Sequence, residues 1–158
     1  MATLTNASDQ FGVLIGILER THPGWIKVKL ALQYYVQTLN EFQAWVEANL
    51  QIYETDLRAL VGHLEAFAHV TDASKNFEFE PKVEPSFKLL LHRVLHDSNY
   101  CSVCSLTIDL KHVFGMNIPS AYREDQITLR FHTNEQRFQQ FITNLLKEVE
   151  VMPGRRSL

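Results

Sequence analysis

Two cysteines, Cys101 and Cys104, form the single Cys-x-x-Cys pair of the chain. Such a pair can bind zinc or perform redox chemistry. Structural zinc needs four convergent ligands, and without a second pair the site would have to recruit distant histidines such as His92 or His112. The pair also falls in a segment of alternating polar and apolar residues, where residues three apart point to opposite faces of a strand. We therefore expect no metal or redox site, and reduced thiols.

Acid–base chemistry has equally little support among the seven histidines. Four of them lie at or near predicted strand ends, mostly on faces expected to be wet: His92, His96, His112 and His132. None belongs to a recognised catalytic or metal-binding motif, so a surface role is the default interpretation. Glu78, Glu80 and Glu84 do not fit a calcium-binding loop, and phosphate-binding glycine loops are absent. The sequence thus predicts no catalytic, cofactor-binding or metal-ligating residues, and a protein that is not an enzyme.

The N-terminal part of the chain predicts a β-hairpin. The segment 11–18 is densely apolar, and in the segment 25–36 apolar residues alternate with lysines and glutamine. Alternation with a period of two indicates a strand with one wet face, and the intervening Pro23-Gly24 is a turn signal.

A change of period then predicts a helix over 38–62. Thr38 and Glu41 match a capping box, and at 100° per residue one arc is apolar. This arc consists of Phe42, Trp45, Val46, Leu50, Tyr53, Leu57 and Leu60. Gly62 would end the helix, and Trp45 would anchor it in the core.

The remaining elements are mostly strands. Short strands are expected at 64–70 and 77–80, and a second hairpin from the segments 87–95 and 100–112. Residues 113–125 form a long loop, and 126–132 a last strand.

Thr133 opens a second capping box, and the helix after it has an apolar arc that includes Phe141. The tail 152–158 is expected to fray.

The element order lacks regular strand–helix–strand alternation, which excludes a doubly wound parallel sheet. We predict an α+β two-layer sandwich, in which two amphipathic helices cover one face of a mostly antiparallel sheet. The segments that open with Thr38 and Thr133 resemble each other, which hints at two similar halves.

Composition places the chain among single-domain globular proteins. It has 158 residues, of which 46% are hydrophobic and 21% charged, enough for one core that spans about residues 10–151. No apolar run could span a bilayer and no signal peptide is evident, so we expect a cytoplasmic protein.

Charge is unevenly distributed along the chain. The net charge is −3, and residues 41–85 carry nine acidic against three basic side chains. The absence of a basic stripe argues against nucleic-acid binding. An acidic middle could attract a basic partner, although a solvated surface is the simpler interpretation.

Three features recur together in this chain: the segment 57–64 (LRALVGHL), Phe79, Pro81 and Pro85 before an apolar strand, and the segment 129–131 (LRF) before the last helix. With these features, the layout over about residues 10–150 resembles that of the WapI-type immunity proteins of bacterial polymorphic toxin systems. Here one extra residue separates the two prolines. Membership would imply a non-enzymatic protein that binds and neutralises a secreted toxin.

We therefore expect an acidic strip to contribute to a toxin interface: Glu47, Glu54, Glu78, Glu80 and Glu84. Glu47 and Glu54 would lie on one exposed line of the first helix. Two alternatives remain open. One is a ligand-binding or enzymatic domain with a pocket between sheet and helices, using His92, His112 and Tyr122. The other is a homodimeric adaptor.

Overall fold

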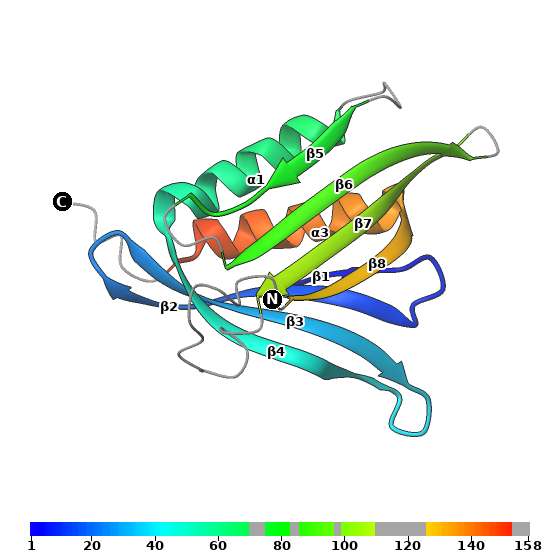
Figure 1. Ribbon diagram of the computed structural model, residues 1–158, viewed down its shortest axis with the longest axis horizontal. Coiled ribbons are helices and arrows are strands. Elements are labelled where there is room, and N and C mark those ends of the chain that lie inside the picture. Colours follow the sequence, from blue (N-terminus) through cyan, green and yellow to red (C-terminus); the bar gives the residue numbers. More distant parts are fainter. Residues whose placement is uncertain (70–74, 83–85, 97–98, 110–125, 153–158) are drawn as a thin grey trace.

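A computed structural model describes residues 1–69, 75–82, 86–96, 99–109 and 126–152. These residues form two antiparallel sheets of four strands each and two helices (Figure 1). The first sheet has the order β1(Ala2–Thr5), β2(Phe11–His22), β3(Trp25–Val36), β4(Glu41–Tyr53). The second has the order β5(Asn76–Phe79), β6(Phe87–His96), β7(Asn99–Asp109), β8(Gln126–Asn134). The helices α1(Glu54–Ala68) and α3(Glu135–Glu150) follow β4 and β8. The predicted α+β sandwich is thereby confirmed.

Both predicted hairpins are present, as β2–β3 and β6–β7. The strands predicted near residues 77–80 and 126–132 are also present, as is the last helix. The packed region begins earlier than the predicted residue 10, because Ala2 and Leu4 of β1 are fully buried. The predicted loop 113–125 and the tail from residue 153 lie outside the described residues.

The helix predicted over 38–62 is wrong in its first part. Residues Glu41–Tyr53 form β4, and α1 begins only at Glu54. Burial in β4 alternates with a period of two, because Val46, Ala48, Leu50 and Ile52 are buried and the residues between them are exposed. The prediction placed these apolar residues on a helical arc, whereas in the structure they follow the period of two of a strand.

Because residues Glu41–Tyr53 form a strand and not a helix, further expectations are also wrong. Trp45 is 63% exposed instead of buried. Thr38 lies in the turn between β3 and β4 and caps no helix. Gly62 lies inside α1, which continues to Ala68, so the strand predicted over 64–70 does not exist.

The second capping box is wrong by one residue. Asn134 is the N-cap of α3, and its side-chain oxygen accepts a hydrogen bond from the Arg137 N–H at 2.9 Å. The Thr133 hydroxyl instead donates to the Thr5 carbonyl at 2.8 Å. Thr133 therefore joins β8 to β1 and does not cap the helix.

The described chain consists of two halves with the same order of elements, four strands and then a helix. In each half the first helical residue is a glutamate that pairs with an arginine of the second strand: Glu54 with Arg20, and Glu135 with Arg93. The expected internal similarity is thus present, but Thr38 and Thr133 do not mark equivalent positions.

Each helix contacts both halves. α3 contacts β1 and β2 of the first sheet as well as β7 and β8 of its own, and α1 contacts β5 of the second sheet as well as β4. Asp56, the third residue of α1, bonds to the segment after β5, and Arg137, the third residue of α3, bonds to the segment after β1. Asp56 accepts a hydrogen bond from the Lys82 N–H at 3.2 Å. The Arg137 Nε donates to Asp9 at 3.0 Å.

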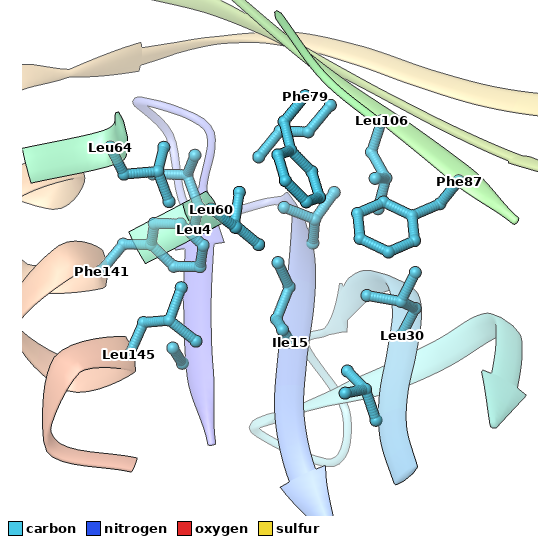
Figure 2. Packing of buried hydrophobic residues seen from close by; sticks show 14 of the residues in the cluster. Leu4, Ile15, Leu30, Leu60, Leu64, Phe79, Phe87, Leu106, Phe141 and Leu145 are labelled. Carbon is cyan, nitrogen blue, oxygen red and sulfur yellow. The ribbon is translucent and has the colours of Figure 1, made fainter. Parts of the chain in front are cut away.

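One hydrophobic core joins both sheets and both helices. Figure 2 shows its side chains converging from β1, β2, β3, α1, β5, β6, β7 and α3. The helices contact each other through Phe67 of α1 and Phe138 of α3, whose ring centroids are 6.0 Å apart. Burial of this apolar surface is the main stabilising contribution.

Two glycines give opposite predictions for substitution by alanine. At Gly12 an added Cβ would lie 2.9 Å from the Leu4 backbone oxygen, so β1 would have to move. Gly12→Ala should therefore lower the free energy of unfolding by about 1–3 kcal/mol. At Gly62 nothing lies within 4 Å of the added atom, and Gly62→Ala should raise it by about 0.5–1 kcal/mol. Urea unfolding measures both, and a stabilising Gly12→Ala would contradict the packing of β1 on β2.

Candidate functional site

The acidic strip predicted on one helix does not exist as a helical line. Glu47 lies on β4, and its carboxylate is 3.1 Å from the Lys29 Nζ on the neighbouring strand. Glu54 is the first residue of α1. The two side chains therefore belong to different elements, and the seven-residue spacing has no helical meaning here. Whether these acids contact a partner remains a prediction.

Glu54 is held by two cations at the start of α1. Its Oε2 lies 2.5 Å from the Arg20 Nη1, and its Oε1 accepts from the Arg58 Nε at 2.9 Å and Nη2 at 2.6 Å. The Glu54 N–H donates to the Gly24 carbonyl at 2.8 Å, which joins the helix start to the β2–β3 turn. Hydrogen bonds from Arg20 and then Arg58 lower the pKa of Glu54 to about 2. This carboxylate supports the fold.

Glu54→Gln should flatten the dependence of stability on pH between about pH 5 and pH 2. The folded-state pKa is depressed from 4.5 to about 2. The stabilisation is therefore complete above the unfolded pKa and is lost as the pH falls through the folded pKa. Melting temperatures across this range test the expectation, with Glu65→Gln as a control on an exposed carboxylate of the same helix. Equal acid sensitivity of wild type and Glu54→Gln would refute it.

The other predicted acids belong to the second sheet. Glu78 on β5 lies 2.5 Å from the Lys88 Nζ on β6. Its hydrogen bond, supported by the charges of Glu78 and Glu80, raises the pKa of Lys88. Glu80 is exposed just after β5, and Glu84 lies outside the described residues.

Cys104 faces the core from β7 and is fully buried. Burial raises the pKa of its thiol to about 12, so the reactive thiolate is scarce at neutral pH. Within the described residues, no group of three or more histidine, cysteine or acidic side chains could hold a metal ion.

His92 lies on the exposed face of the second sheet, not between sheet and helices. Its Nδ1 is hydrogen-bonded to the Asn76 Oδ1 on β5. His112 and Tyr122, the other polar groups proposed for a pocket, lie outside the described residues.

Among the described residues, exposed and half-buried apolar side chains lie on both faces of the β3–β4 hairpin near its turn. We call this region the aromatic end, which consists of Phe11, Tyr34, Tyr35, Leu39, Phe42 and Trp45. The exposed fractions are 63% for Trp45, 53% for Leu39, 44% for Phe11 and 41% for Tyr34. Figure 1 shows this end of the hairpin away from the two helices.

The strand register explains how the aromatic end is built. Phe11 of β2 lies directly opposite Tyr34 of β3. Leu32 pairs with Val46 and Gln33 with Ala44, so Trp45 is an extra residue in a β-bulge. Bulges bend a strand and redirect side chains, and this one places the indole of Trp45 in solvent.

Local contacts hold the hairpin turn in place. The rings of Tyr35 and Phe42 lie edge to face with centroids 5.4 Å apart. The Tyr35 hydroxyl donates to the Asn40 side chain, and Asn40 has a φ of 53°, a left-handed value that asparagine tolerates. The aromatic end is therefore an ordered surface. Sequence reasoning missed it because Trp45 and Phe42 were assigned to a buried helical arc.

No helix in the described part of the chain has the length and apolar character needed to cross a membrane.

Comparison with known proteins assigns no family or function to this chain. No protein-family model matches the sequence, and no curated protein matches it.

Proposed function

We propose that this chain is a non-catalytic protein that binds and neutralises a protein toxin, with the aromatic end as the centre of its interface. The observation that carries the proposal is the group of large apolar side chains exposed around one hairpin end: Phe11, Tyr34, Leu39 and Trp45. The resemblance to WapI-type immunity proteins supplies the class of partner.

The chemistry of these side chains favours a protein interface. Isolated exposed apolar residues are common and need no explanation, but an exposed group of them marks a surface for interaction. Tryptophan and tyrosine are also enriched among the residues that contribute most to binding energy. Because the Tyr35–Phe42 contact and the bulge at Trp45 fix the hairpin, little ordering entropy would be lost on binding.

Charged residues next to the aromatic end would have a separate role. Glu47 lies two residues from Trp45 on β4, and Lys29 is its ion-pair partner. Charges at the rim of an interface act mainly on the association rate, whereas central aromatic anchors act on dissociation. We therefore keep Glu47 in the proposed interface. Glu54 is left out of this proposal because its side chain is only 18% exposed and pairs with Arg20 and Arg58.

In the test, each protein encoded by a neighbouring gene is expressed in cells, once alone and once together with this chain, and cell survival is measured. For a neighbour that is toxic alone and neutralised by this chain, binding is measured for Trp45→Ala and Tyr34→Ala. We expect each to weaken the affinity by about 30-fold, the scale of a hot-spot residue. Val151→Ala, which truncates another exposed apolar side chain, is the control and should change nothing.

Glu47→Lys should slow association at low salt, with a smaller effect as the ionic strength rises. Glu65→Lys on α1 is the matched charge reversal away from the hairpin. If the Trp45 and Tyr34 variants bind and protect like the wild type, the interface lies elsewhere. If no neighbouring protein is neutralised, the immunity function itself is refuted.

A further inference from the structure

The exposed face of the second sheet contains a shallow depression of about 250 Å³. Its position follows from the register of four strands. Glu78 pairs with Leu90, Leu90 with Ser105, and Ser105 with Arg130, so these residues form one row across β5, β6, β7 and β8. Residues in such a row point to the same face of the sheet. The depression is distinct from the aromatic end, which belongs to the first sheet.

The floor of the depression is apolar. Leu90 of β6 is half-buried, and Val103 of β7 is only 8% exposed although it lies on the face opposite the core. Apolar residues at the centre of a wet sheet face, surrounded by polar ones, are typical of a small-ligand site.

The charged side chains on the polar rim differ in whether they have a partner. The carboxylate of Glu78 is neutralised by Lys88, and the imidazole of His92 is hydrogen-bonded to Asn76. Arg130 has no ion-pair or hydrogen-bond partner for its guanidinium among the described residues. The Ser105 hydroxyl is its neighbour in the row. A planar guanidinium beside a hydroxyl group suits a carboxylate, which it can bind through two parallel hydrogen bonds.

We propose that this depression binds a small monocarboxylic acid, with the carboxylate on Arg130 and the apolar body of the ligand on Leu90 and Val103. One guanidinium matches one negative charge, and the apolar floor excludes a fully polar anion. The volume lies below the 300–1,000 Å³ of typical ligand sites, which limits the ligand to a compact molecule. A dissociation constant in roughly the millimolar range is expected for so few contacts.

The experiment is an NMR titration of the isotope-labelled full chain with 3-phenylpropionate. Saturable shifts should occur at the backbone amides of Leu90, Val103 and Ser105. The uncharged isostere 3-phenylpropanamide should bind at least about tenfold more weakly, because it cannot pair with the guanidinium. Arg130→Gln should weaken binding of the acid by about the same factor, and Lys147→Gln, an exposed cation on α3, should have no effect.

Three results would each overturn the proposal: shifts that do not saturate by about 20 mM, equal binding of the acid and the amide, or unchanged binding by Arg130→Gln. The spectrum of Arg130→Gln before titration shows whether that variant is folded. Because Arg130 is exposed, we expect a native spectrum. The outcome is independent of toxin binding, since neither the probe nor the variants involve the aromatic end.

Discussion

Replacing Phe141 by alanine is expected to lower the free energy of unfolding by about 3–5 kcal/mol. Phe141 is fully buried in α3 and belongs to the core shared by both sheets and both helices (Figure 2). Truncation removes the transfer free energy of the ring and leaves a cavity, which the surrounding strands can fill only partly. Urea unfolding followed by circular dichroism measures the change.

Trp45→Ala is the matched control, because it truncates an aromatic residue of β4 whose ring is in solvent. A surface substitution of this kind changes stability by no more than about 0.5 kcal/mol. A large loss of stability in Trp45→Ala, or a small one in Phe141→Ala, would contradict the burial of these two residues.

Arg93→Ala should lower the free energy of unfolding by about 3 kcal/mol. The Arg93 side chain is 2% exposed, and its Nη1 lies 3.0 Å from Glu135 at the start of α3. Its Nη2 donates to the carbonyls of Phe67 and Ala68 at the end of α1, at 3.2 and 2.9 Å. Removal of the guanidinium leaves the two carbonyls without their donor and removes its packing over the Phe67 ring.

Arg20→Ala provides the comparison from the equivalent position in the first half. The Arg20 side chain is 24% exposed, and Glu54 keeps Arg58 as a second cation when Arg20 is removed. We therefore expect a loss of only about 1 kcal/mol, because Arg58 still neutralises the Glu54 carboxylate. Equal losses in the two variants would show that burial does not distinguish the two ion pairs.

Much of the fold follows from local patterns in the sequence. The β2–β3 hairpin is predictable because alternating residues flank Pro23-Gly24, and Gly24 indeed adopts a φ of 81°. The last helix is predictable from its apolar arc, although its cap is Asn134 and not Thr133.

The segment Glu41–Tyr53 shows why the rest is not predictable. Val46 and Leu50 are four residues apart and fit both a helical and a strand period. What decides between them is the partner strand. Every residue of β4 except Trp45 pairs with β3, across a turn in which Asn40 is left-handed. This pairing cannot be predicted from the sequence of the segment alone, because strand preference depends on the neighbouring strand.

The candidate sites depend on the same non-local information. Trp45 becomes a surface residue only through a bulge in the β3–β4 register. Arg130 and Glu78 are about fifty residues apart in sequence, and three strand pairings place them in one row. A sequence can suggest which residue types are present, but the register determines which of them meet.

The contact of each helix with both halves has a consequence for how the protein folds. Because α3 contacts β1 and β2 as well as its own sheet, and α1 contacts β5 as well as β4, each half alone would leave part of its apolar surface exposed. Most of the stabilising contacts therefore join residues distant in sequence, which slows folding by raising the contact order. Unfolding should be a single cooperative transition. Two fragments divided after α1 should each be unstructured alone and regain structure only when mixed.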